Sequence, residues 1–228
     1  MNNFGVLFDM DGVIVDNHIY HRKSWRAFAE RHGRAISDEE YNEKMNGRTV
    51  TEVTRVVFGE ELPPDKVKQY SVEKESMYRD IYKPHLKAVP GVEDFLIMLR
   101  ELNIPAAVAT SAPADNVVFT LDGLGLRKYF DSILDDRAVT KGKPHPEIYK
   151  KSAAAIGIPA DRCVVFEDAL AGMAAARSAG CAVVALATTH TADELTHADK
   201  IIHDFKGLNA DFVKNLIEIN FARTGKGN

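Results

Sequence analysis

The chain has 228 residues, of which 45% are hydrophobic and 27% are charged, and its formal net charge is -4. This length allows one large domain, two domains, or one domain with an insertion. The composition has neither the basic excess of a nucleic-acid-binding protein nor the low apolar content of a disordered chain. We therefore expect a globular protein without a nucleic-acid partner.

The N-terminus does not carry the long uncharged apolar stretch of a secretory signal or a membrane span. Its apolar run, Val6 to Phe8, is followed at once by acidic residues. The two cysteines, Cys163 and Cys181, open apolar runs, as reduced thiols near a core would. These features predict a cytoplasmic protein without a membrane partner, and we expect it to be a monomer.

Apolar runs and helical stripes alternate along most of the chain. The first run, residues 4–8, is short and ends at acidic residues, which predicts a buried strand. Further strands are expected at 104–109, 132–134, 163–166, 182–186 and 201–202, and helices at 92–102, 117–124, 146–156, 170–179 and 212–216. Repeated units of strand and helix predict an α/β fold with a doubly wound parallel, Rossmann-like sheet.

Residues 17–83 do not fit that alternation, because they are charged, helical in period and without a convincing strand pattern. Helical segments are expected there around 25–29, 41–45, 50–58 and 67–81. We interpret this region as a helical cap domain inserted after the first strand. The core domain would then comprise residues 1–16 and 84–228.

Two carboxylates, Asp9 and Asp11, follow the first strand directly. One carboxylate of such a pair can attack phosphorus as a nucleophile, while the other transfers the proton on the bridging oxygen. Taken alone, the pair is equally well interpreted as a solvated turn. Open α/β sheets place their chemistry at the carboxyl ends of their strands, so the residues at the later strand ends decide between these interpretations.

Later strand ends and loops carry groups that suit phosphoryl transfer. Thr110 offers a hydroxyl to a phosphate oxygen, and Lys143 offers a positive charge. Glu167 and Asp168 offer carboxylate oxygens to a hard cation such as Mg2+. Structural roles stay open as alternatives: a strand-end cap for Thr110, a solvated loop charge for Lys143, and a salt-bridge partner for Glu167.

These residues resemble the motifs of the haloacid dehalogenase superfamily, more narrowly its phosphatase and β-phosphoglucomutase-like branch with a helical cap. The resemblance covers nearly the whole chain, through Asp9-Met10-Asp11-Gly12-Val13, Thr110, Lys143-Pro144, and Glu167-Asp168 with Gly172. It implies that Asp9 is the nucleophile and a metal ligand, and that Asp11 is the general acid/base with its backbone carbonyl on Mg2+. It also implies that Asp168 is a direct or water-linked ligand and that Glu167 orients the waters of the metal.

The same resemblance implies how the phosphoryl group is held. Thr110 and Lys143 would bind it, and Ser111 and Asn116 would contribute to substrate binding nearby. Lys141, two residues before Lys143, is interpreted as a surface charge. Substrate choice is expected to depend on the cap.

In the cap, Lys74, His21 and Trp25 stand out. Lys74 falls on an apolar helical stripe, where a charge is unusual. His21 and Trp25 are four residues apart and can face the active-site cleft together. A snorkelling lysine and a packed histidine are the structural alternatives.

The cap also bears on the choice between a hydrolase and a mutase. His21 and Trp25 match positions that β-phosphoglucomutase uses, and Gly47 and Arg48 are expected in the substrate site. Val50, however, stands where the mutase pattern carries an arginine for the second phosphate. We therefore predict a Mg2+-dependent phosphohydrolase of a small phosphorylated metabolite, such as a sugar phosphate, acting through an aspartyl-phosphate. The alternatives are a hexose-phosphate mutase, other phosphoryl or dehalogenase chemistry, and a phosphate-binding regulatory module.

Overall fold

The structure is a computed structural model that describes residues 3–46 and 48–224. The chain divides into two compact units. Residues 17–85 form one of them, which we call the helical unit, and residues 1–16 with 86–228 form the other, which we call the core unit.

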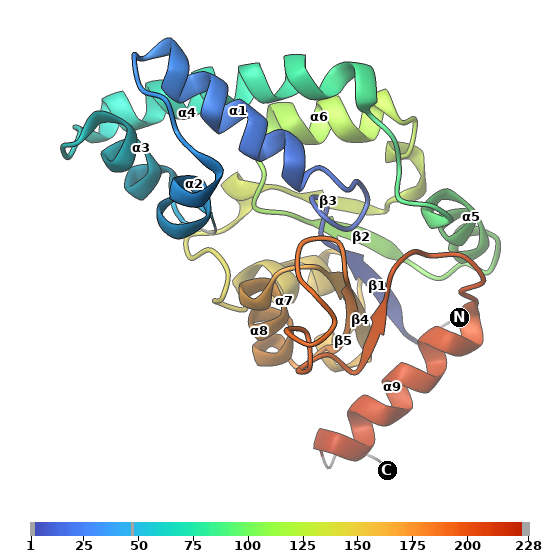
Figure 1. Ribbon diagram of the computed structural model, residues 1–228. Helices are drawn as coiled ribbons and strands as arrows, with labels where there is room; N and C mark the ends of the chain where they lie inside the picture. Colours follow the sequence, from blue (N-terminus) through green and yellow to red (C-terminus); the bar gives the residue numbers. More distant parts are fainter. Residues whose placement is uncertain (1–2, 47, 225–228) are drawn as a thin grey trace. The chain divides into compact units, whose positions relative to one another are not determined.

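Within the described residues, six parallel strands form the sheet of the core unit (Figure 1). They are β1 (Gly5–Phe8), β2 (Ala106–Ala109), β3 (Ser132–Leu134), β4 (Cys163–Glu167), β5 (Ala182–Leu186) and β6 (Lys200–Ile202). Their spatial order is β3-β2-β1-β4-β5-β6. β1 is therefore central, and Val6 lies beside both Ala106 and Val164 in register.

Helices cover both faces of this sheet. They are α5 (Val92–Glu101), α6 (Ala114–Gly123), α7 (Glu147–Ala155), α8 (Leu170–Ala179) and α9 (Ala210–Thr224), with short 3-10 helices at Arg127–Tyr129, Asp136–Ala138 and Ala160–Arg162. Successive strand residues point to opposite faces. Leu7 is buried in a cluster with Tyr149 of α7 and Met173 of α8, whereas its neighbour Phe8 contacts Phe95 of α5. The predicted doubly wound parallel α/β sheet is thus confirmed.

Several expected element boundaries need correction, among them those of one strand and one helix of the core unit. The strand expected from Ile104 begins at Ala106, because Pro105 has no N–H for the ladder, although its carbonyl accepts the Val6 N–H at 3.0 Å. The helix expected over 146–156 spans Glu147–Ala155. Neither change moves a candidate site residue.

The helical unit consists of α1 (His18–Arg31), α2 (Asp38–Lys44), α3 (Val50–Phe58), α4 (Pro64–Tyr82) and a 3-10 helix at Lys83–His85. Sequence signals account for several of the helix ends in this unit. The Ser37 hydroxyl caps α2, and Thr49 with Glu52 forms a capping box that opens α3. Gly59 ends α3 in the left-handed region, at φ 75°. The helices enclose a core of Trp25, Phe28, Ala29, Ile36, Tyr41, Met45, Val53 and Val57.

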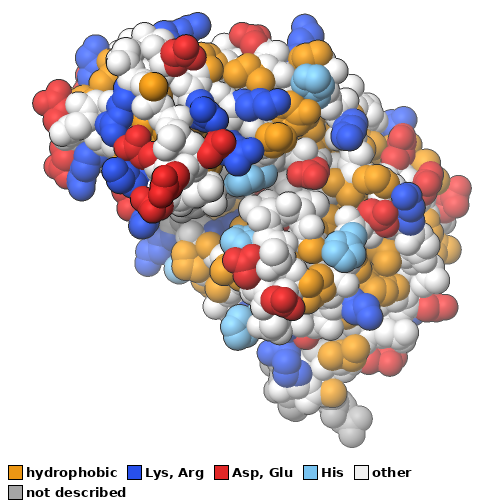
Figure 2. All heavy atoms as spheres, in the orientation of Figure 1, with side chains coloured by type: hydrophobic (Ala, Val, Ile, Leu, Met, Phe, Trp, Pro, Cys, Tyr) orange, Lys and Arg blue, Asp and Glu red, His pale blue; other side chains and the backbone are white. Residues whose placement is uncertain are grey.

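Charged side chains of both signs are interspersed over the face of the protein that Figure 2 shows. Mixing of this kind keeps local electrostatic fields small. Among the helices of the described residues, none combines the length and the apolar composition that crossing a bilayer requires.

Candidate active site

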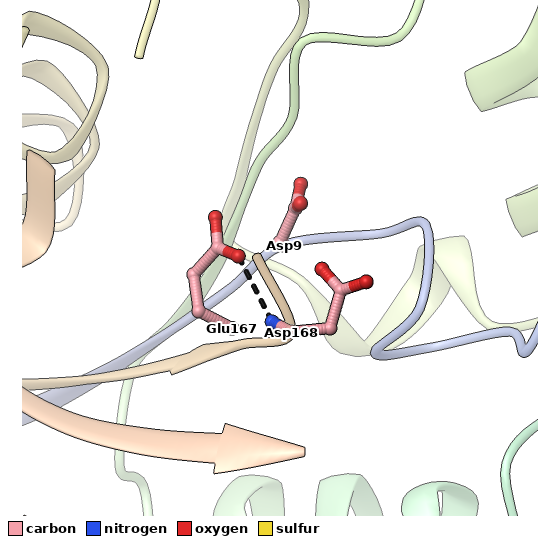
Figure 3. A group of neighbouring side chains, drawn as sticks. All are labelled: Asp9, Glu167 and Asp168. Carbon is pink, nitrogen blue, oxygen red and sulfur yellow. Dashed lines mark hydrogen bonds between the residues drawn. The ribbon is translucent and has the colours of Figure 1, made fainter. Parts of the chain in front are cut away.

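Three carboxylates meet at the carboxyl edge of the core sheet. Asp9 follows β1, Glu167 ends β4, and Asp168 comes next. Because β1 and β4 are parallel neighbours, both strands deliver their ends to one place, and one oxygen from each carboxylate lies within 4.8 Å of the other two. All three residues are buried, and Figure 3 shows the Asp9 and Asp168 carboxylates pointing to the same side of the chain.

Lys143 balances part of this negative charge. Its ammonium lies 3.1 Å from Asp9 Oδ2 and 2.5 Å from Glu167 Oε1. Burial alone would lower the pKa of Lys143, but the Asp9 and Glu167 carboxylates outweigh burial and raise it. Lys143 therefore stays charged inside the site, and the alternative of a solvated loop charge is wrong. Lys141, in contrast, is exposed.

Glu167 is engaged by the protein at both oxygens. Oε1 accepts hydrogen bonds from Lys143 and from the Tyr149 hydroxyl, the latter at 2.7 Å. Oε2 accepts from the backbone N–H groups of Asp168 and Ala169, at 2.9 and 3.0 Å. Burial raises the pKa of Glu167, but Lys143 and these donors outweigh it and hold the pKa below its ordinary value. This geometry suits a residue that positions Lys143 and the Asp168 backbone.

Asp9 carries the unsatisfied atom of the site. Oδ1 is buried and has no hydrogen-bond partner among the described residues. Burial raises the pKa of Asp9 from 3.8 to about 7, against the attraction of Lys143 and with additional repulsion from Glu167 and Asp11. A buried carboxylate oxygen of this kind is costly unless a cation or a ligand satisfies it. Hard divalent cations favour such oxygen donors, so the residues fit the implied Mg2+.

Two glycines allow the carboxylates to come this close. Gly12 has φ 73°, and a Cβ built there would overlap the carboxylate of Asp168. A Cβ at Gly172, on α8, would overlap the carboxylate of Glu167. Any side chain at either position would push a carboxylate out of the cluster.

The other core candidates differ in burial. Asp11 is partly exposed in the loop after β1. Thr110 is buried at the end of β2, and its hydroxyl accepts the Ala112 N–H at 3.0 Å, which leaves the hydroxyl proton able to donate elsewhere. The expected strand-end cap is therefore present and is compatible with phosphate binding. Ser111 is exposed, and Asn116 is buried on α6.

In the helical unit, the structure brings Lys74, His21 and Trp25 together. The Lys74 ammonium lies 2.8 Å from His21 Nδ1 and 5.1 Å from the centre of the Trp25 ring. It also donates to Glu75 at 2.8 Å, and the His21 ring stacks on Tyr78 with ring centres 3.9 Å apart. The Lys74 side chain is only 3% exposed, so the alternative of a snorkelling lysine is wrong. Burial first, and then the charge of Lys74, lower the pKa of His21 well below its ordinary value.

Arg48 does not join this cluster. Its side chain is 54% exposed and lies 4.0 Å from the Glu52 carboxylate at the start of α3. Gly47, the other expected contact in this loop, lies outside the described residues.

Sequence reasoning missed three side chains of the core site. Tyr149 binds Glu167, Thr189 donates to Asp168 Oδ2, and Thr188 donates to the Gly12 carbonyl at 2.6 Å. A signal existed for the threonines, because they follow β5 at the sheet edge where the other candidates lie. Tyr149 had no such signal, since it reads as one more apolar residue of α7.

Comparison with known proteins agrees with this geometry. Residues 5–180 match the family model of the haloacid dehalogenase-like hydrolases. A validoxylamine A 7'-phosphate phosphatase from Streptomyces hygroscopicus is 30% identical over 198 residues, which cover 87% of this chain and 92% of the phosphatase.

Solved structures give the same result. A haloacid dehalogenase hydrolase of family IA, variant 3, from Entamoeba histolytica has a TM-score of 0.89 and 30% identity, covering 94% of this chain and 99% of that one. A β-phosphoglucomutase from Clostridium difficile has a TM-score of 0.82 and 27% identity, and the match covers 98% of this chain and 100% of the mutase chain. The chain therefore belongs to the haloacid dehalogenase-like hydrolase family, in its β-phosphoglucomutase-like branch, and is an enzyme of the hydrolase or phosphotransferase type.

Proposed function

We propose that this chain is a Mg2+-dependent phosphohydrolase of a small monophosphate ester, such as a sugar phosphate, with Asp9 as the nucleophile. One observation carries the proposal. Asp9 is held by Lys143 through Oδ2 while its buried Oδ1 has no partner in the described part of the chain, beside a second buried carboxylate at Asp168. The arrangement supports a reactive carboxylate next to a cation site.

Asp9 and Asp168, with the backbone carbonyl of Asp11, are the residues that would hold Mg2+. Glu167 is a weaker candidate for direct ligation, because both of its oxygens already accept hydrogen bonds from the protein. When bound, the ion would neutralise charge on the phosphoryl oxygens.

The protein groups then account for two displacements at phosphorus. In the first, the Asp9 carboxylate forms a bond to phosphorus, the bond to the ester oxygen breaks, and Asp11 gives that oxygen its proton. In the second, Asp11 takes a proton from water as the water oxygen attacks phosphorus, and the bond to Asp9 breaks to release phosphate. Lys143 and the Thr110 hydroxyl would hold the equatorial oxygens in both steps.

We propose that residues 17–83, which belong to the helical unit, act as a cap domain. Residues 1–16 and 84–228 would then form the catalytic core. The buried cluster of Lys74, His21 and Trp25 offers a cation, an imidazole and an aromatic face, which suits recognition of a hydroxylated or anionic part of a substrate. We further infer a cytoplasmic monomer, with both buried cysteines in the thiol form.

A mutase is the second candidate, because the Lys74 cluster and the similarity to a β-phosphoglucomutase favour it. A mutase must hold two phosphate groups, and two strong cationic clamps are needed for that. Val50 stands at the expected position of the second clamp, and Arg48 is exposed beside Glu52. We therefore favour water as the phosphoryl acceptor. A regulatory module that only binds phosphate is the least favoured candidate.

A panel of sugar phosphates and other small monophosphate esters, assayed for phosphate release with Mg2+ and with EDTA, tests the proposal. β-Glucose 1-phosphate with a bisphosphate primer is assayed in parallel for glucose 6-phosphate. We expect Mg2+-dependent phosphate release that Asp9→Asn abolishes. Rapid formation of glucose 6-phosphate with little phosphate release would instead favour the mutase, and no turnover of any ester would favour the regulatory module.

A further inference from the structure

The loop after β5 touches two parts of the candidate site through adjacent side chains. Thr188 donates a hydrogen bond to the carbonyl of Gly12, in the loop that follows Asp9, at 2.6 Å. Thr189 donates to Oδ2 of Asp168, in the loop that follows β4. The two hydroxyls thus join the nucleophile loop and the metal loop to a third segment of the chain.

That third segment is anchored on both sides of the threonines. Before them, the Ala187 N–H donates to the Ile202 carbonyl of β6 at 2.9 Å. After them, Leu195 is completely buried in the core cluster that also contains Leu7. An anchored loop fixes the positions of its hydroxyl groups, because its backbone cannot move away without breaking these contacts.

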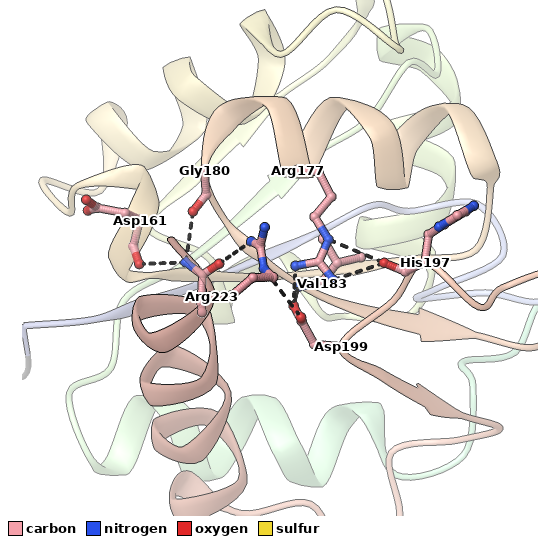
Figure 4. A network of polar contacts seen from close by, with 8 residues as sticks. Asp161, Arg177, Gly180, Val183, His197, Asp199 and Arg223 are labelled. Carbon is pink, nitrogen blue, oxygen red and sulfur yellow. Dashed lines mark hydrogen bonds and ion pairs between the residues drawn. The ribbon is translucent and has the colours of Figure 1, made fainter. Parts of the chain in front are cut away.

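The far end of the loop is fastened by a charged network, shown in Figure 4. Arg177 of α8 donates to the His197 carbonyl at 2.9 Å and to the Asp199 carboxylate at 2.6 Å. The same carboxylate accepts the Val183 N–H of β5 at 2.8 Å. Helix α8, strand β5 and the end of the loop are therefore tied together.

The contacts at Asp168 restrict its carboxylate from two directions. Thr189 binds Oδ2, and the missing side chain of Gly12 provides the space that the same oxygen occupies. A carboxylate with one oxygen fixed in this way presents its other oxygen, Oδ1, in a defined direction. Removing a group that donates a hydrogen bond to a metal ligand typically lowers the metal affinity of the site.

We propose that Thr189 is a positioning residue for the Mg2+ site, which fixes Oδ2 of Asp168 so that Oδ1 is directed at the metal. Thr188 supports it by holding the loop against the Gly12 carbonyl. This inference rests on the proposed function, because it presupposes that Asp168 binds Mg2+.

The test compares Thr189→Val, which removes the hydroxyl and keeps the branched shape, with Thr189→Ser, which keeps the hydroxyl. Thr191→Val is the matched control, because Thr191 lies in the same loop and its hydroxyl binds Glu194 instead of the site. Two quantities are measured for each protein: the Mg2+ concentration at half of the Mg2+-induced rise in melting temperature, and the Mg2+ concentration at half-maximal rate.

For Thr189→Val we expect both Mg2+ midpoints to rise by about 10-fold or more, with most of kcat recovered at saturating Mg2+. Thr189→Ser and Thr191→Val should stay near the wild type. If Thr189→Val melts too early in EDTA to be measured, Thr189→Ala replaces it and has the same expected midpoints.

The proposed role of Thr189 is wrong if Thr189→Val has the same Mg2+ midpoints as the wild type. It is also wrong if Thr189→Ser is impaired as much as Thr189→Val. Failure of the proposed function looks different. In that case the wild type itself would show no Mg2+-induced stabilisation that depends on Asp168, tested with Asp168→Asn.

Discussion

Replacing the proposed nucleophile should make the metal-free protein more stable while abolishing its activity. Asp9→Asn keeps the size of the side chain and an oxygen that can accept from Lys143, but removes the charge. Lys143 keeps its contact with Glu167 at 2.5 Å, so the variant does not create an unpaired buried cation. The variant therefore tests whether the buried charge of Asp9 is maintained at the expense of stability.

The size of the effect follows from the pKa of Asp9, which burial raises from 3.8 to about 7. At 1.36 kcal/mol per pKa unit, this difference corresponds to about 4 kcal/mol. The folded protein holds the proton more tightly than the unfolded chain, so the stability contributed by Asp9 is full below pH 3.8 and is lost as the pH rises through 7. In the metal-free state, Asp9→Asn should exceed the wild type by up to about 4 kcal/mol at pH 8 and by about half of that at pH 5.5.

Urea unfolding in EDTA at pH 8 and pH 5.5 measures these differences, and Asp16→Asn is the control because it removes an exposed charge from the same loop. Saturating Mg2+ should reduce the advantage of Asp9→Asn, since the ion stabilises only the ionised wild-type site. If Asp9→Asn is no more stable than the wild type at pH 8, or if its gain is the same at both pH values, the reasoning is refuted.

Three further predictions concern other buried groups. In the metal-free protein, Lys143→Met should lower the free energy of unfolding by about 3–5 kcal/mol, because Asp9 and Glu167 lose their buried cation. The control variant Lys141→Met should leave the free energy of unfolding unchanged, and equal urea midpoints for the two variants would contradict this prediction. The lowered pKa of His21 means that its stabilising contribution is full above about pH 6.5 and is lost as the pH falls. In thermal melts from pH 7.5 to 5, the melting temperature of the wild type should therefore fall relative to that of His21→Gln, and a difference between the two proteins that stays constant with pH would be evidence against it. Asn220→Ala should cost about 1–3 kcal/mol in thermal melts without changing the rate, because buried Asn220 donates to two backbone carbonyls; an unchanged melting temperature would contradict this.

Much of the core could be predicted because its signals are local. Short apolar runs gave the strands, and the parallel order of β1 and β4 brings Asp9 to Glu167 and Asp168. The end of a parallel strand is a general location for chemistry, so residue type and chain position were sufficient to select these side chains. The same rule, applied to the end of β5, would also have selected Thr188 and Thr189.

Contacts that depend on side-chain direction could not be predicted. Periodicity marked Lys74 as a charge on an apolar stripe, but it could not identify His21 and Glu75 as its neighbours. Likewise, Tyr149 lies on an apolar helix face, and only the fold shows its hydroxyl at Glu167 Oε1. Apart from the Lys74–Glu75 contact, these contacts join residues of different elements, and their geometry follows from how the elements pack.

Chemical trapping of the covalent intermediate tests the central claim most directly. The wild type is mixed with Mg2+ and the best substrate of the ester panel, quenched during turnover and reduced with borohydride, which converts an aspartyl-phosphate to homoserine. Mass spectrometry of the digested protein then locates the modified residue. We predict homoserine at position 9, and none when EDTA replaces Mg2+ or when substrate is omitted. Turnover of the substrate with modification at another residue, or with none, would contradict the assignment of Asp9 as the nucleophile.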